Sequence, residues 1–141
     1  MTLAWILCAL GLVFGAGLGL AGLVFPRWAA RLVRLQEAAP GAAAEFRATF
    51  GGLFFALHAT PLAMLALQAE SNDVGLLLMA TGASGVIAGG WLATAAGRIL
   101  SMALDGTNTP FNRASVGVEA LIGLMIAAPW IAWALQALRI T

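Results

Sequence analysis

Four long stretches with almost no charge constrain this 141-residue chain more than any other feature of its sequence. They run over residues 2–25, 48–69, 74–97 and 116–138. A helix of about 20 apolar residues is long enough to cross a hydrocarbon core of about 30 Å. We therefore expect one all-α domain over residues 1–141, an integral membrane four-helix bundle. Its helices are expected over residues 2–25, 48–69, 74–104 and 116–138.

The composition supports a membrane domain. Hydrophobic residues make up 62% of the chain and charged residues 9%, whereas about 25% of a soluble globular chain is charged. The net charge is +1 and no basic run is interleaved with aromatic residues, so we expect no nucleic-acid partner. The first stretch lacks a positive N-terminal region and exceeds the roughly 7 to 15 apolar residues of a signal peptide. We interpret it as the first helix of the mature protein.

The chain has one cysteine, Cys8, and one histidine, His58. A single cysteine cannot form an internal disulfide or a Cys-x-x-Cys pair, so we interpret Cys8 as a small packing residue. His58 precedes Pro61 by three residues and is either a neutral, hydrogen-bonded group inside the bundle or a secondary candidate for a proton relay or ligand. The chain lacks the set of His and Cys residues that a zinc or haem site requires. We expect no metal and no cofactor.

The arginines are distributed unevenly over the two ends of the expected bundle. With four crossings, the loops after the first and third helices share one side, and both termini share the other. All arginines except Arg139 lie on the first side or beside it. By the positive-inside rule the Arg-rich loops are cytoplasmic. We therefore predict a multi-pass protein of the plasma membrane with both termini outside the cytoplasm.

A short amphipathic segment follows the first apolar stretch. It begins at Pro26, a residue favoured at the first position of a helix. At 100° per residue, Arg27, Arg31 and Arg34 share one face and Trp28 lies on the apolar face. This pattern is typical of a helix in the headgroup layer. We expect these four side chains to anchor the protein at the membrane surface, and specific recognition of an anionic lipid is the alternative.

Small residues recur every four positions in three of the expected helices. The three ridges are Gly11, Gly15 and Gly19; Ala48, Gly52 and Ala56; and Gly85, Gly89, Ala93 and Gly97. Such ridges let helix backbones approach closely within a membrane. They predict a compact bundle surrounded by membrane lipids. The alternative is that glycine-rich faces contact a larger membrane complex or a second copy of the chain.

Charged residues near the expected cytoplasmic ends of the helices form a candidate polar cluster. From the helical rise, Glu119 lies about 12 Å from the middle of its helix, inside a half-thickness of about 15 Å. A carboxylate at that depth requires a partner, for which Arg98 and Arg47 are the candidates. Glu45 and Asp105 join the same rim. The cluster is either an ion-pair clamp between helices or a site for an anionic headgroup or polar small molecule.

Three motifs of this chain resemble a family of small bacterial four-helix membrane proteins described only as a domain of unknown function. They are "EFRATFGG" over 45–52, "RILSMALDG" over 98–106, and Glu119 early in the fourth helix. The family often has Tyr where this chain has Phe50, so no role for a phenol hydroxyl is carried over. The resemblance implies a bacterial inner membrane and no reaction, and its pattern does not include His58. It also implies joint action of Glu45, Arg47, Arg98, Asp105 and Glu119.

From these features we expect a small integral membrane protein without enzymatic activity, either an accessory subunit or a lipid-associated protein. One alternative is a protein that binds or transports a small molecule or lipid, with Glu119 and Arg98 at the cytoplasmic end. Against it, small multidrug transporters of this length depend on a carboxylate in the first helix, where this chain has no charge. The remaining alternative is a membrane-embedded enzyme that uses Glu119 or His58 as a general base.

Overall fold

The structure is a computed structural model that describes residues 2–35 and 41–138. In these two ranges it contains helices and no strand. The elements are α1 (Leu3–Val24), α2 (Pro26–Leu32), α3 (Ala42–Phe46), the π-helix η1 (Arg47–Leu53), α4 (Phe54–Ser71), α5 (Val74–Leu104) and α6 (Pro110–Leu138). Four apolar spans are long enough to cross a membrane: Leu3–Val24, Ala42–Ser71, Val74–Leu104 and Pro110–Gln136. The chain is an all-α, multi-pass membrane bundle, as predicted.

Two of the four spans begin earlier than the sequence predicted. α5 has the predicted bounds, and its start is fixed by Asp73, whose Oδ1 accepts hydrogen bonds from the backbone N–H groups of Gly75 and Leu76 at 2.6 and 3.1 Å. The second span begins at Ala42 rather than at residue 48, and α6 begins at Pro110 rather than at residue 116. Polar residues are compatible with a helix where it extends past the hydrocarbon, and proline is favoured at a helix start.

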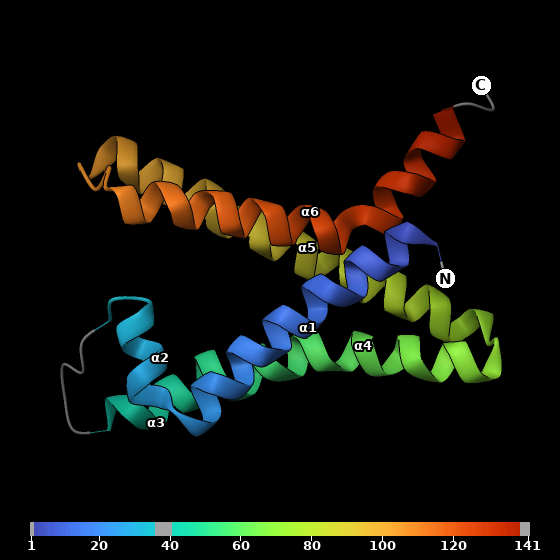
Figure 1. Cartoon of the computed structure of the whole chain (residues 1–141), viewed down its shortest axis with the longest axis horizontal. Helices are drawn as coiled ribbons and strands as arrows, with labels where there is room; N and C mark the ends of the chain where they lie inside the picture. Colours follow the sequence, from blue (N-terminus) through green and yellow to red (C-terminus); the bar gives the residue numbers. More distant parts are fainter. Residues whose placement is uncertain (1, 36–40, 139–141) are drawn as a thin grey trace.

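The long helices are adjacent in the cyclic order α1, α4, α5, α6 (Figure 1). α1 packs against α4, α6 and η1, and α5 packs against α4 and α6. The α2–α3 region and the turn between α5 and α6 lie at one end of the bundle. The start of α1 and the turn between α4 and α5 lie toward the other end, and the last part of α6 bends away (Figure 1). Pro129 lies inside α6 and accounts for this bend.

Glycines of α1 allow close contact with the second span of the same chain. A Cβ atom at Gly19 would collide with the backbone of Phe55. One at Gly22 would lie 2.7 Å from the carbonyl oxygen of Phe50. Both glycines are buried. The glycine face of α1 therefore packs against the second span of the same chain.

The other two ridges are more open. Ala48 and Ala56 are exposed at the outer surface of the second span. A Cβ atom at Gly89 or Gly97 of α5 would meet no other atom within 4 Å. Of the three ridges, that of α1 therefore makes the tightest contacts within the chain, and much of the α5 ridge faces outward.

α2 is the short helix that the amphipathic pattern predicted. It buries Pro26, Ala29 and Ala30 against the protein and leaves Trp28 exposed. It ends where Arg34 adopts a left-handed conformation with φ of 61°. The larger apolar side chains of this segment are consequently exposed at the surface of the bundle, as expected of a helix in the headgroup layer.

Candidate functional site

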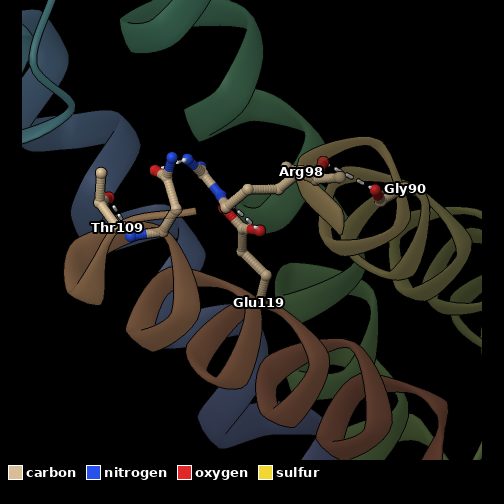
Figure 2. A network of polar contacts seen from close by, with 6 residues as sticks. Gly90, Arg98, Thr109 and Glu119 are labelled. Atoms are coloured by element: carbon tan, nitrogen blue, oxygen red, sulfur yellow. Dashed lines mark hydrogen bonds and ion pairs between the residues drawn. The ribbon is translucent and has the colours of Figure 1, made fainter. Parts of the chain in front are cut away.

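Glu119 of α6 is paired with Arg98 of the neighbouring helix α5 (Figure 2). Nη2 of Arg98 donates to Oε1 of Glu119 at 2.6 Å, and Nε lies 3.1 Å from both carboxylate oxygens. The Glu119 side chain is 9% exposed and that of Arg98 30% exposed. The partner that the depth of Glu119 requires is therefore Arg98.

Asn112 extends this pair into a network that joins α5, the following turn and α6. Nη1 of Arg98 donates to Oδ1 of Asn112 at 3.2 Å, and Nδ2 of Asn112 donates to the carbonyl oxygen of Thr107 at 2.7 Å. The backbone N–H of Asn112 donates to Oγ1 of Thr109 at 3.2 Å (Figure 2). Sequence reasoning missed Asn112, although it precedes Glu119 by seven residues and therefore shares its helix face.

The other members of the predicted cluster lie elsewhere on the same end of the molecule. Nε of Arg47 donates to the carbonyl oxygen of Leu23, near the end of α1, at 3.2 Å. Asp105 follows α5 and is exposed, and Glu45 is an exposed residue of α3. Within the described ranges, none of these three residues forms an ion pair with Arg98 or Glu119. The structure thus brings together two of the five predicted residues.

His58 lies inside the bundle and has both ring nitrogens hydrogen-bonded. Nδ1 lies 2.8 Å from the carbonyl oxygen of Phe54 and therefore donates to it. Nε2 accepts the indole N–H of Trp91 at 2.9 Å. Because an indole nitrogen only donates, the ring is neutral and carries its proton on Nδ1. This geometry supports the interpretation of His58 as a structural group, held by a tryptophan that the sequence did not identify.

Cys8 is also a buried packing residue, and its Sγ donates to Oγ of Ser84 at 3.4 Å. Every buried side-chain nitrogen and oxygen in the described ranges has a hydrogen-bond partner. The same ranges contain no group of three or more His, Cys, Asp or Glu residues that could hold a metal ion.

A pocket of about 480 Å³ lies between the α1–α2 junction and the start of the second span. We call it the arginine pocket because Arg27, Arg31 and Arg47 line it, together with Trp28 and other residues of the junction. Three of the predicted surface anchors thus meet one member of the predicted polar cluster. The fourth anchor, Arg34, instead places its guanidinium carbon 3.9 Å from the centre of the Phe111 ring in α6.

Residues 2–135 match the family described as "Domain of unknown function (DUF4345)". The match extends over nearly all four spans and confirms the resemblance to a family of unknown function. No curated protein and no solved structure matches the chain.

Proposed function

The chain belongs to the DUF4345 family, and from that premise we propose that it is a lipid-associated membrane protein without enzymatic activity. The observation that supports this proposal is the different use of its arginines. Arg98 is paired with the buried carboxylate of Glu119, whereas Arg31 and Arg47 line a pocket at a surface of the molecule.

Both candidates for a general base are engaged in hydrogen bonds. A general base needs a lone pair within reach of the proton that it removes. The carboxylate of Glu119 accepts hydrogen bonds from two nitrogens of Arg98. The Nε2 lone pair of His58 accepts the indole N–H of Trp91. These contacts favour structural roles for Glu119 and His58 over catalysis.

Lipid is the ligand class that suits the arginine end of the molecule. Phe25 is 63% exposed and Trp28 51% exposed, directly beside the arginine pocket. Indole rings prefer the membrane interface, and each arginine near an anionic surface contributes about 1 kcal/mol of attraction. By the positive-inside rule, this end faces the cytoplasmic leaflet of the plasma membrane.

Lipid extraction from the purified protein tests the proposal. The protein is purified in a mild detergent and its bound lipids are counted by native mass spectrometry. We expect retained phospholipid, and a lower unfolding temperature once that lipid is removed. A monomer that carries no lipid, and whose unfolding temperature does not respond to added lipid, would overturn the proposal. A stoichiometric protein partner without lipid would instead support the accessory-subunit alternative.

A second candidate is a polar small-molecule site at Glu119 and Arg98, favoured by the partial exposure of Arg98. Glu119→Gln separates it from a structural clamp. A clamp predicts a less stable variant that still retains lipid. Loss of a retained small molecule with unchanged stability would favour the second candidate.

A further inference from the structure

We propose that the arginine pocket binds one phosphate group, held by the guanidinium groups of Arg31 and Arg47. The inference rests on the proposed lipid association and adds the chemistry of the ligand. The phosphate belongs to an anionic phospholipid headgroup or to a soluble phosphate ester, and both present the same oxygens to the pocket.

Arg31 and Arg47 come from different elements, and each is oriented by a single hydrogen bond through Nε. Nε of Arg31 donates to the carbonyl oxygen of Arg27 at 3.3 Å, and Nε of Arg47 donates to that of Leu23 at 3.2 Å. In the described part of the chain, the terminal nitrogens of Arg31 and Arg47 make no hydrogen bond or ion pair. Two oriented guanidinium groups therefore present unused donors at one pocket.

The charge of the pocket favours a phosphate, and its size admits the larger molecule that carries the phosphate. Three arginines line it and no described carboxylate does. A guanidinium group donates two parallel hydrogen bonds to phosphate oxygens, and it is more weakly hydrated than an ammonium group. The volume of about 480 Å³ falls within the roughly 300 to 1,000 Å³ of small-molecule sites. Trp28 beside the arginines offers an apolar surface to the glycerol and upper acyl region of a phospholipid.

The π-helix η1 explains how Arg47 reaches this position. A Cβ atom at Gly51 would lie 2.7 Å from the backbone nitrogen of Leu23, so η1 packs directly on the end of α1. Arg47, at the start of η1, hydrogen-bonds the same residue of α1. Short π-helical segments occur frequently at functional sites. Gly51 thus allows the close packing of η1 on the end of α1, and Arg47 of the same segment lines the arginine pocket.

Binding measurements on the full chain in detergent micelles test the proposal. The probes are short-chain phosphatidic acid, short-chain phosphatidylcholine, glycerol phosphate and inorganic phosphate. We expect phosphatidic acid to bind more tightly than phosphatidylcholine. Arg31→Gln combined with Arg47→Gln should weaken it roughly a hundredfold or more, because each substitution removes at least one hydrogen bond to a charged group and each such loss weakens binding about tenfold or more. The corresponding pair of lysine variants keeps the charge and should weaken binding less.

Arg113→Gln is the matched control, because Arg113 is an exposed arginine at the same end that does not line the pocket and donates to Asn108 at 2.9 Å. Unchanged affinity in the double Gln variant, or an equal loss in Arg113→Gln, would overturn the phosphate site. If the wild-type protein and the double Gln variant retain the same lipids, the phosphate site is overturned but the proposed lipid association is supported. If the protein binds glycerol phosphate or inorganic phosphate but binds none of the lipids, the phosphate site is supported and its ligand is a soluble phosphate. The proposed lipid association is then overturned.

Discussion

The hydrogen bonds around Glu119 explain how α6 carries a carboxylate close to the hydrocarbon edge. Removing such a group from water costs several kcal/mol unless it is paired and hydrogen-bonded. Arg98 supplies the opposite charge through two nitrogens, and Asn112 holds a third nitrogen of the same guanidinium group. The fixed geometry of the arginine makes the pair a link between α5 and α6.

Removing the carboxylate charge should therefore destabilise the bundle. We expect Glu119→Gln to lower the free energy of unfolding by about 1–3 kcal/mol, below the roughly 3–5 kcal/mol of a fully buried pair, because Arg98 is partly exposed. A double-mutant cycle with Arg98→Gln, followed by detergent-induced unfolding, should give a coupling energy above about 0.5 kcal/mol. Glu45→Gln, at an exposed position, is the control. Additive effects in the cycle would contradict the clamp.

The hydrogen bonds of His58 predict a specific tautomer. Nitrogen NMR of the histidine-labelled protein should show a protonated Nδ1 and an unprotonated Nε2, because Trp91 donates to Nε2. Trp91→Phe removes this donor and should shift the Nε2 resonance while the rest of the spectrum is largely retained. A protonated Nε2 in the wild-type protein would show that the pair of hydrogen bonds has been assigned incorrectly.

At the scale of the elements, the packing of α1 on the second span depends on the positions of Gly19 and Gly22 more than on the number of glycines in α1. Gly19 lies against the backbone of Phe55, whereas a Cβ atom at Gly17, two residues earlier, would meet nothing within 4 Å. Backbone atoms cannot move aside as a side chain can, so a methyl group at Gly19 has to separate the helices.

We expect Gly19→Ala to destabilise the bundle by about 1–3 kcal/mol through overpacking. Gly17→Ala in the same helix should be neutral or slightly stabilising, because alanine has the higher helix propensity. Detergent-induced unfolding of both variants measures the difference. Equal stability of the two variants would mean that α1 and the second span are not in the close contact described.

The helices of this chain were predictable where a single physical signal dominates. Hydrophobic length located all four spans. The early starts of the second span and of α6 were missed because polar residues after a loop suit either a helix or a coil. The π-helix over 47–53 was not predictable, because it depends on the contact of Gly51 with the end of α1.

The candidate sites were predictable only in part, and the limit has the same cause. Helical rise alone indicated that Glu119 needs a partner, but the choice of Arg98 over Arg47 depends on which helices are neighbours. The approach of Arg47 to Arg31 brings together α2 and the start of the second span, and local periodicity contains no information on the distance between two such segments. Asn112 and Trp91 were missed because one amide or indole group has no distinctive spacing of its own.

At the scale of the whole molecule, the two ends of the bundle differ in chemistry. The end with α2, α3 and the α5–α6 turn carries the arginine pocket and the Arg98 network. At the other end, the last turn of α4 carries Glu70 and the start of α5 is capped by Asp73. Anionic lipids of a cytoplasmic leaflet attract arginine-rich segments. The distribution of charge therefore predicts both the orientation of the protein and the leaflet that the arginine pocket faces.

Cysteine labelling in intact cells checks this orientation. Glu70→Cys and Asp105→Cys replace exposed residues at opposite ends of the bundle. A membrane-impermeant maleimide should label Glu70→Cys from outside, whereas Asp105→Cys should react only after permeabilisation, because arginine-rich loops remain cytoplasmic. The wild-type chain is the control, since its single Cys8 is buried and should react only after denaturation. The reverse labelling pattern would place the arginine pocket in the outer leaflet and contradict the predicted topology.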